Sequence, residues 1–367
     1  MNLNFSPLRK ILLSAVTLLG LGLLAGCNTS SDLQPTSAQP EQKVEQNALA
    51  GFPNFTYQKV IADTTIFPPR PNDPEHTYSE LIFPSVIKAS DYFANPLGTY
   101  YMYYAPHDAP AGIYLAYSNS PSGPWTRYSD IPIITRQWVT QVTGSTSLIS
   151  HVSSPHAIWV PDETTNQKLY LYFHGENTAT RLAKSSDGIH FTYDKTVIAT
   201  SGTYKKIDGL TEVSYARVYR YTMPSKGNRY TMVLMGVDNG TRKIYLCWSG
   251  EARNWRCQNN ALITPNSSES GGQFGGPQAA GPAFFPWKGK HYVVFNAGSG
   301  NIHIAEVGAD FNLENHLGVF YDSRDTAPEN GRVGASTYLT VGSTMYMYYE
   351  VGQRGATKIA LATAPIP

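Results

Sequence analysis

Five segments of the chain repeat one pattern, and this repetition constrains the fold more than any other feature. In each, an aromatic-rich strand is followed by a polar loop and by a second strand in which small residues alternate. The alternation has the two-residue period of a β-strand, so each segment predicts a hairpin. The segments start 53 to 69 residues apart, at Gly98, Gln167, Asn228, Gly289 and Gly342. A chain built this way should fold as a series of similar antiparallel units.

Each hairpin has a further apolar strand before it, and most have another strand behind it. The preceding strands are expected over residues 80–87, 153–160, 215–221, 281–287 and 335–341. The following strands are expected over residues 125–134, 191–199, 255–263 and 317–322. Four strands in each of about five units predict an all-β protein, a five-bladed β-propeller.

The fifth unit ends without an outer strand, because the chain stops after "TKIALATAPIP". The stretch "FTYQKVIA" at residues 55–62 stands alone near the other end, and it is nearly a copy of "FTYDKTVIA" at residues 191–199. The second copy is the outer strand of unit two. We therefore expect residues 55–62 to complete the fifth blade, closing the ring and covering an exposed sheet edge.

The N-terminal segment predicts export. Residues 1–27 carry Arg9 and Lys10 ahead of an apolar run that is short for a membrane span. The run ends in Leu-Ala-Gly-Cys, which resembles a bacterial lipobox and implies cleavage before Cys27 and a lipid on that residue. An ordinary signal peptide with a chance cysteine is the alternative. Residues 28–50 are rich in Ser, Gln, Pro and Glu and predict a flexible linker, leaving residues 51–367 for the propeller.

Charge and cysteine content narrow the partners. The formal net charge is +1 and 15% of residues are charged, so we expect no nucleic acid and no membrane contact beyond the lipid anchor. The expected location is an exported lipoprotein of the outer membrane, and the expected state is a monomer. Cys247 and Cys257 flank nine residues symmetrically, as partners across a hairpin do, and an exported protein permits a disulfide there.

Polar residues are expected to converge at one mouth of the propeller axis. The starts of the first strands and the loops between second and third strands share one face of such a ring. These places hold His, acidic, amide and Arg side chains: Glu80, His107, Asp108, His151, His156, His174, Glu176, Asn177, Glu212, Arg217, Asp238, Asn239, Gln278, Asn296 and Glu350. We expect Asp238 and Glu350 to be solvated loop ends and the others to form a binding cleft.

Two stretches are similar to segments of known glycosidases. "YYMYYAPHD" with the later "GIYLAYSNSPSGPW", and the turn in "AKSSDGIHF", resemble five-bladed propeller glycosidases of the arabinanase, xylosidase and levansucrase type. Glycoside hydrolase family 43 is the nearest, and the resemblance covers about residues 55–366. It implies two essential carboxyl groups at the axis and a third acid that tunes them. It implies no required cofactor and a structural Ca²⁺ in the channel at most, with no metal ligands marked in this chain.

The resemblance assigns roles at individual positions. "TEVSYAR" at residues 211–217 is similar to the stretch with the general acid and places Glu212 in that role. Where the family has Asp before Pro in blade one, this chain has Phe83-Pro84, so Glu80 or Asp108 is the candidate base. His156 takes the place of the tuning acid. The remaining candidates for substrate binding are His107, His174, Glu176 and Arg217.

Three functions follow from these residues. The first is a glycoside hydrolase acting on a polysaccharide or oligosaccharide through carboxylate acid/base catalysis. The second is a non-catalytic carbohydrate-binding surface lipoprotein on a glycosidase-like propeller. The third is a metal-dependent hydrolase or lyase with ligands drawn from His107, His151, His156 and His174.

Overall fold

The computed structural model describes residues 49–107 and 110–366. The predicted signal segment 1–27 with Cys27, the linker up to residue 48, and Asp108 lie outside the described residues. None of the helices in the described ranges is long and apolar enough to cross a membrane.

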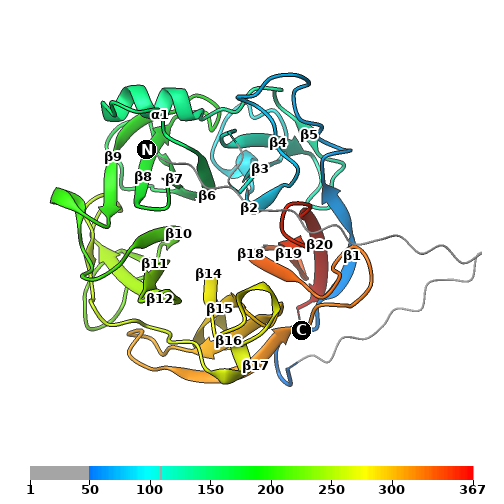
Figure 1. Cartoon of the computed structure of the whole chain (residues 1–367), viewed down its shortest axis with the longest axis vertical. Helices are drawn as coiled ribbons and strands as arrows, with labels where there is room; N and C mark the ends of the chain where they lie inside the picture. The colour runs from blue at the N-terminus through cyan, green and yellow to red at the C-terminus, as the bar shows by residue number, and fades with distance from the viewer. Residues whose placement is uncertain (1–48, 108–109, 367) are drawn as a thin grey trace, which may run out of the picture. The chain divides into compact units, whose positions relative to one another are not determined.

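Twenty strands form five four-stranded antiparallel sheets, arranged around one axis as the blades of a propeller (Figure 1). Blades one and two contain β2 (Ile82–Ile87), β3 (Tyr100–Ala105), β4 (Tyr114–Ser118) and β5 (Thr126–Arg127), then β6 (Val152–Trp159), β7 (Leu169–Gly175), β8 (Ala179–Ser185) and β9 (Thr192–Ala199). Blade three contains β10 (Glu212–Tyr219), β11 (Tyr230–Asp238), β12 (Thr241–Ser249) and β13 (Arg256–Cys257). The predicted all-β five-bladed propeller is confirmed.

The last two blades and the short helices complete the chain. Blade four contains β14 (Ala279–Trp287), β15 (Lys290–Ala297), β16 (Ile302–Glu306) and β17 (Asn315–Tyr321). Blade five contains β18 (Val333–Val341), β19 (Thr344–Val351), β20 (Lys358–Pro365) and β1 (Thr56–Ala62). Within the described residues, one α-helix, α1 (Arg136–Thr143), and four 3₁₀ turns lie in connections: η1 (Ala89–Asp91), η2 (Gly202–Tyr204), η3 (Ser267–Glu269) and η4 (Gly272–Phe274).

The N-terminal strand closes the ring, as the duplicated stretch predicts. β1 pairs antiparallel with β20, with Thr56 opposite Thr363 and Val60 opposite Ala360. In Figure 1 the first and last strands lie side by side in the same blade. Ile61 of β1 is 5% exposed and packs in the apolar cluster between blades five and one, which also contains Leu81. We call this closing contact of β1 the clasp, and it combines backbone pairing with side-chain burial.

The core of the described chain is distributed between blades. Five apolar clusters each join neighbouring blades, and a smaller sixth lies at the axis. The axial cluster draws Phe83, Tyr215 and Ala335 from three different blades. Because each seam is apolar on both faces, a blade cannot leave the ring without exposing two such surfaces to water.

Similar hydrogen bonds join neighbouring blades at each seam. The loop between the second and third strands of one blade bonds to the start of the inner strand of the next blade. The bonds are Ser153 Oγ to Pro106 O, Val213 N to Asn177 O, Arg242 N to Gln278 Oε1, Val333 N to Gly300 O and Leu81 N to Thr357 O. These loops and strand starts therefore share one face of the ring, which is the face expected to hold the site.

Every inner strand breaks its register at the same place. A shift occurs near the start of β2, β6, β10, β14 and β18, and one residue in each has a φ between 34° and 57°. These residues are Phe83, Ser154, Tyr215, Gly281 and Ala335. Such bulges turn side chains away from the simple alternation of a strand. In a non-glycine residue this backbone costs about 1–3 kcal/mol and is found most often at functional sites.

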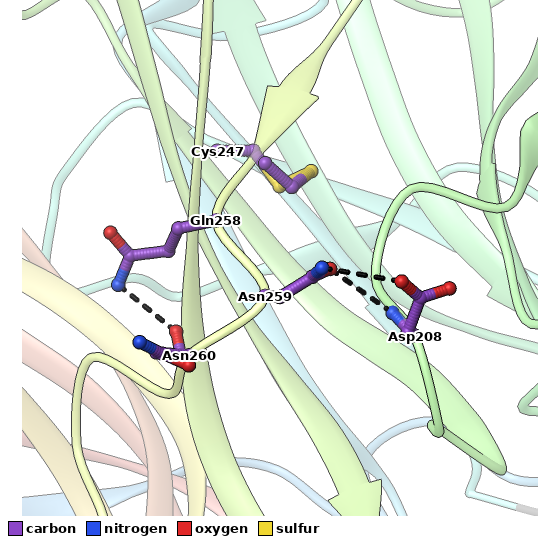
Figure 2. The surroundings of a disulfide bond; sticks show 6 residues. Asp208, Cys247, Gln258, Asn259 and Asn260 are labelled. Atoms are coloured by element: carbon purple, nitrogen blue, oxygen red, sulfur yellow. Dashed lines mark hydrogen bonds between the residues drawn. A yellow bond between two sulfur atoms is a disulfide. The ribbon is translucent and has the colours of Figure 1, made fainter.

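The two cysteines of blade three form a disulfide. Cys247 of β12 lies opposite Cys257 of β13, and their sulfur atoms are bonded (Figure 2). The chain that follows is held by Asn259, which exchanges hydrogen bonds with the backbone N–H and the carboxylate of Asp208. The outermost strand of blade three has only two residues, so the covalent bond holds an edge that few ladder bonds secure.

A substitution in the closing strand tests the clasp. Ile61→Ala should lower the free energy of unfolding by about 2–4 kcal/mol, because it removes buried methyl groups from the seam between blades five and one. Lys59→Ala, on the exposed part of the same strand, should change it by less than about 0.5 kcal/mol. Urea unfolding followed by tryptophan fluorescence measures both, and equal effects of the two variants would contradict the clasp.

Candidate active site

The buried tyrosine at the bulge of β10 is the centre of the candidate site. Tyr215 is 5% exposed, and its hydroxyl is hydrogen-bonded to Nε2 of His107 at 2.9 Å. The rings of Phe83 and His174 lie 4.8 and 5.5 Å from its ring. Side chains from blades one, two and three thus meet at the axis, on the face that holds the loops between second and third strands.

Four charged side chains act on the Tyr215 hydroxyl. Burial raises the pKa of Tyr215, the guanidinium groups of Arg242 and Arg354 oppose that rise, and the carboxylates of Glu212 and Glu350 add to it. The tyrosine is therefore a neutral hydroxyl at physiological pH, able to donate and accept hydrogen bonds. Two cations and two anions, from blades three and five, thus lie near enough to influence the pKa of Tyr215.

Glu212 is the half-buried carboxylate of this cluster. It begins β10 and lies opposite Val237 of β11. Ser214 Oγ donates a hydrogen bond to its Oε1 at 2.6 Å. Among the described residues no cation forms an ion pair with Glu212, so its position suits a group that meets a ligand.

Glu350 is buried, and the expectation that it is a solvated loop end is wrong. It is 3% exposed, and Oε1 accepts a hydrogen bond from Arg332 at 2.6 Å. Its Oε2 has no hydrogen-bond partner among the described residues. The close approach requires glycine at position 334, where a Cβ would lie 2.6 Å from Glu350 Oε1. Asp238 is partly exposed and pairs with Lys243.

Glu80 is held by the β19–β20 loop of blade five. Its Oε2 accepts hydrogen bonds from Gly355 N and Thr357 Oγ1, both at 2.8 Å, and Arg354 lies 3.5 Å from Oε1. The side chain is 7% exposed. These contacts join blade one to blade five and orient Arg354, which in turn acts on Tyr215.

Blade two adds histidines to the same face. His174 is 1% exposed, and its ring lies 5.6 Å from the ring of His151. His151 is hydrogen-bonded through Nε2 to Asn177 Oδ1 at 3.1 Å. Glu176 is the more exposed neighbour, with its carboxylate 4.0 Å from Arg181.

His156 and Arg217 follow the bulges of β6 and β10, so they lie farther along these inner strands than Ser154 and Tyr215. Arg217 is 1% exposed and donates to Pro155 O, and burial lowers its pKa to about 10, so it stays charged. His156 donates from Nε2 to Val218 O at 2.8 Å. Burial and the Arg217 charge lower the pKa of His156 to about 3, so it is neutral. His156 lines a cavity of about 450 Å³ at the far ends of the inner strands, together with Trp159.

No three His, Cys, Asp or Glu side chains within residues 49–107 and 110–366 gather as a metal ion would require. The structure thus brings His107 and His174 to Tyr215, with Glu212 near enough to influence its pKa, and bonds Glu80 to the loop that carries Arg354. His156 lines the cavity at the far ends of the inner strands, and Arg217 lies near enough to Glu350 for that carboxylate to influence its pKa. Sequence reasoning missed four members of the cluster: Phe83, Tyr215, Arg242 and Arg354. The one available signal was Tyr215, which lies inside the "TEVSYAR" stretch.

No protein family model and no curated protein matches the sequence, but several solved structures with a similar fold are glycoside hydrolases. A glycosyl hydrolase from Bacteroides ovatus is 13% identical, with a TM-score of 0.61, over 88% of this chain and 99% of that one. A thermostable family-43 glycoside hydrolase is 14% identical, with a TM-score of 0.57, over 78% and 92%. An α-L-arabinofuranosidase from Podospora anserina, in complex with cellotriose, is 10% identical, with a TM-score of 0.57, over 85% and 97%. The chain has the five-bladed propeller fold of these glycosidases, as the sequence resemblance implies.

A substitution of Glu80 tests whether this carboxylate holds the seam between blades five and one. Glu80→Ala should lower the free energy of unfolding by about 2–4 kcal/mol, because it leaves the donors of the blade-five loop buried and unpaired. Glu176→Ala, which removes an exposed carboxylate, should stay within about 0.5 kcal/mol of the wild type. Chemical denaturation measures both. Wild-type stability in Glu80→Ala would show that this carboxylate does not hold the seam.

Proposed function

We propose that the protein is a glycoside hydrolase whose active site is the cluster around Tyr215. One observation carries the proposal: side chains from three blades meet around Tyr215 at the axis, and the carboxylates of Glu212 and Glu350, from blades three and five, lie near enough to raise the pKa of its buried hydroxyl. Glycoside hydrolysis needs two carboxyl groups that flank one bond, one to protonate the leaving oxygen and one to act as base or nucleophile. The glycosidase fold supports the same function.

The two carboxylates differ in the way the reaction requires. We assign proton delivery to the leaving oxygen to Glu212, the less buried of the two, which accepts a hydrogen bond from Ser214 Oγ. Glu350 forms an ion pair with Arg332, and its Oε2 is buried without a hydrogen-bond partner among the described residues. A carboxylate with one oxygen uncommitted suits a base or nucleophile. Glu350 therefore takes the role that the sequence left to Glu80 or Asp108.

Neutral polar groups hold the sugar between these carboxylates. Tyr215 and His107 form a hydrogen-bonded pair that can donate to one sugar hydroxyl and accept from another. His174 adds a buried ring beside them, and Phe83 supplies an apolar wall. Glu80 contributes indirectly by orienting Arg354.

A second candidate is a carbohydrate-binding protein without catalysis. Phe83 favours it, because it occupies the bulge before Pro84 where the resembling glycosidases have an acid. The hydrogen bonds that occupy both oxygens of Glu80 favour it as well. In this function Tyr215, the histidines and Phe83 would bind a sugar that is then released unchanged.

We also propose that the protein acts outside the cytoplasm. The apolar run within residues 1–27 and the Leu-Ala-Gly-Cys sequence support export and lipidation at Cys27, with residues 28–50 as a tether. Mass spectrometry of the protein from its native membrane tests this, since a diacylated or triacylated N-terminal Cys27 is the expected product.

A glycoside panel tests the hydrolase. The wild type should release sugar from at least one aryl-glycoside or oligosaccharide, and Glu212→Gln and Glu350→Gln should each lower kcat by about 10²–10⁴-fold, the usual contribution of acid–base groups. Glu176→Gln is the matched control and should keep most of the activity. Binding of a sugar without release by the wild type would establish the second candidate. Full activity in both Glu212→Gln and Glu350→Gln would remove this site from the reaction.

A further inference from the structure

Arg242 is a cation of the Tyr215 cluster that has no carboxylate partner among the described residues. Arg332 is paired with Glu350, and Arg354 lies beside Glu80. Among the described residues no carboxylate lies within ion-pair distance of Arg242. The residue is half-buried, so its guanidinium is partly desolvated without an anionic partner.

The surrounding contacts fix Arg242 at the site. Its backbone N–H donates to Gln278 Oε1 at 2.7 Å, across the seam between blades three and four. Its guanidinium carbon lies 4.5 Å from the centre of the Phe274 ring. Stacking on an aromatic face holds a guanidinium plane in place and leaves its N–H edge available for a further partner.

Strand register places Arg242 in one row with the proposed acid. Glu212 of β10 lies opposite Val237 of β11, and Val237 lies opposite Arg242 of β12. Residues directly opposite on neighbouring strands project to the same face of the sheet. Arg242 and Glu212 therefore share one face of blade three, two strands apart, and both act on the Tyr215 hydroxyl.

A small hollow adjoins the Arg242 contact. It has a volume of about 50 Å³ and is lined by Phe274, Asn296, Arg332 and Gln353, with glycines at positions 272 and 298. A space of this size holds a few waters or a substituent of a few atoms, since one water needs roughly 10–15 Å³ of such volume. The lining is mixed: Asn296, Arg332 and Gln353 carry N–H donors, and Phe274, Ala297 and Val333 are apolar.

We propose that the site takes an anionic saccharide, whose oxyanion substituent binds the guanidinium of Arg242. The inference rests on the proposed binding of carbohydrate around Tyr215. A guanidinium presents two parallel N–H groups that match the two oxygens of a carboxylate or a sulfate ester. A uronic acid and a sulfated sugar are both sources of that chemistry. A neutral sugar would bring only hydroxyl groups to Arg242 and would leave the charge of the guanidinium unbalanced.

Isothermal titration calorimetry with matched methyl glycosides tests this. The panel pairs methyl glucuronide and methyl galacturonide with methyl glucoside and methyl galactoside, and adds a sulfated methyl galactoside. The wild type should bind at least one anionic member about tenfold more tightly than its neutral counterpart, and high salt should reduce this preference. Stronger binding of the uronide or of the sulfated sugar identifies the source.

Variants of neighbouring residues provide the control. Arg242→Gln should abolish the preference for the anionic sugar, so that the variant binds the anionic sugar and its neutral counterpart with similar affinity. Lys243→Gln removes the same charge from the opposite face of β12, where Lys243 pairs with Asp238, and should keep the preference. Arg242→Lys keeps the charge without the paired N–H groups and should lose part of it, which preserves the test if Arg242→Gln does not fold.

The outcomes separate this inference from the proposed hydrolase. Equal binding of anionic and neutral sugars, a preference that survives in Arg242→Gln, or no binding of any panel member would overturn the role of Arg242. Release of neutral sugars without an anionic preference would leave the hydrolase standing and remove this inference. Arg242-dependent binding of a uronide or sulfated sugar without any hydrolysis would support this inference and remove the hydrolase.

Discussion

The closure of the ring is the constraint on which the rest of the structure depends. β1 and β20 come from opposite ends of the described chain, and their pairing gives blade five its fourth strand. The apolar seams cooperate in this, because each blade is buried on two sides only when the ring is complete. Closure also sets the distance between blade five and blade one, across which Glu80 reaches Gly355 and Thr357.

The candidate site depends on this closure rather than on any one blade. Glu212 and Arg242 come from blade three, Glu350 and Arg354 from blade five, and all four act on Tyr215. A displacement of one blade would change several charge interactions at once. The seam bonds between loops and the next inner strand limit such displacement, so the polar cluster is held by the same contacts that hold the propeller.

Burial of charge at the axis is the main cost of this arrangement. Arg217 and Glu350 are almost fully buried, and burial lowers the pKa of Arg217. Charged groups in such surroundings normally require partners. Arg332 provides one for Glu350, and the strained backbone at Tyr215 and Phe83 lies in the same region. Desolvated charges together with strained bulges are typical of a site organised for binding or catalysis.

The sequence by itself determined the architecture. Two-residue periodicity predicted the hairpins, the count of apolar strands predicted five blades, and the duplicated stretch at residues 55–62 predicted the closing strand, because these features depend on local alternation and on strand number. The sequence could also place Glu212 and His107 on the correct face. It could not place Glu350, because burial depends on a neighbouring blade and on the close approach at Gly334.

Only the tertiary structure decided which of the candidate residues meet. The bulge in every inner strand shifts its register, so simple alternation does not tell where Arg217 or His156 points relative to Glu212. The "TEVSYAR" stretch contains Tyr215, but nothing in the sequence indicated its central role, since its neighbours come from blades far apart in the chain. Charge convergence between distant segments is a property of the closed ring, and no local pattern in the sequence carries it.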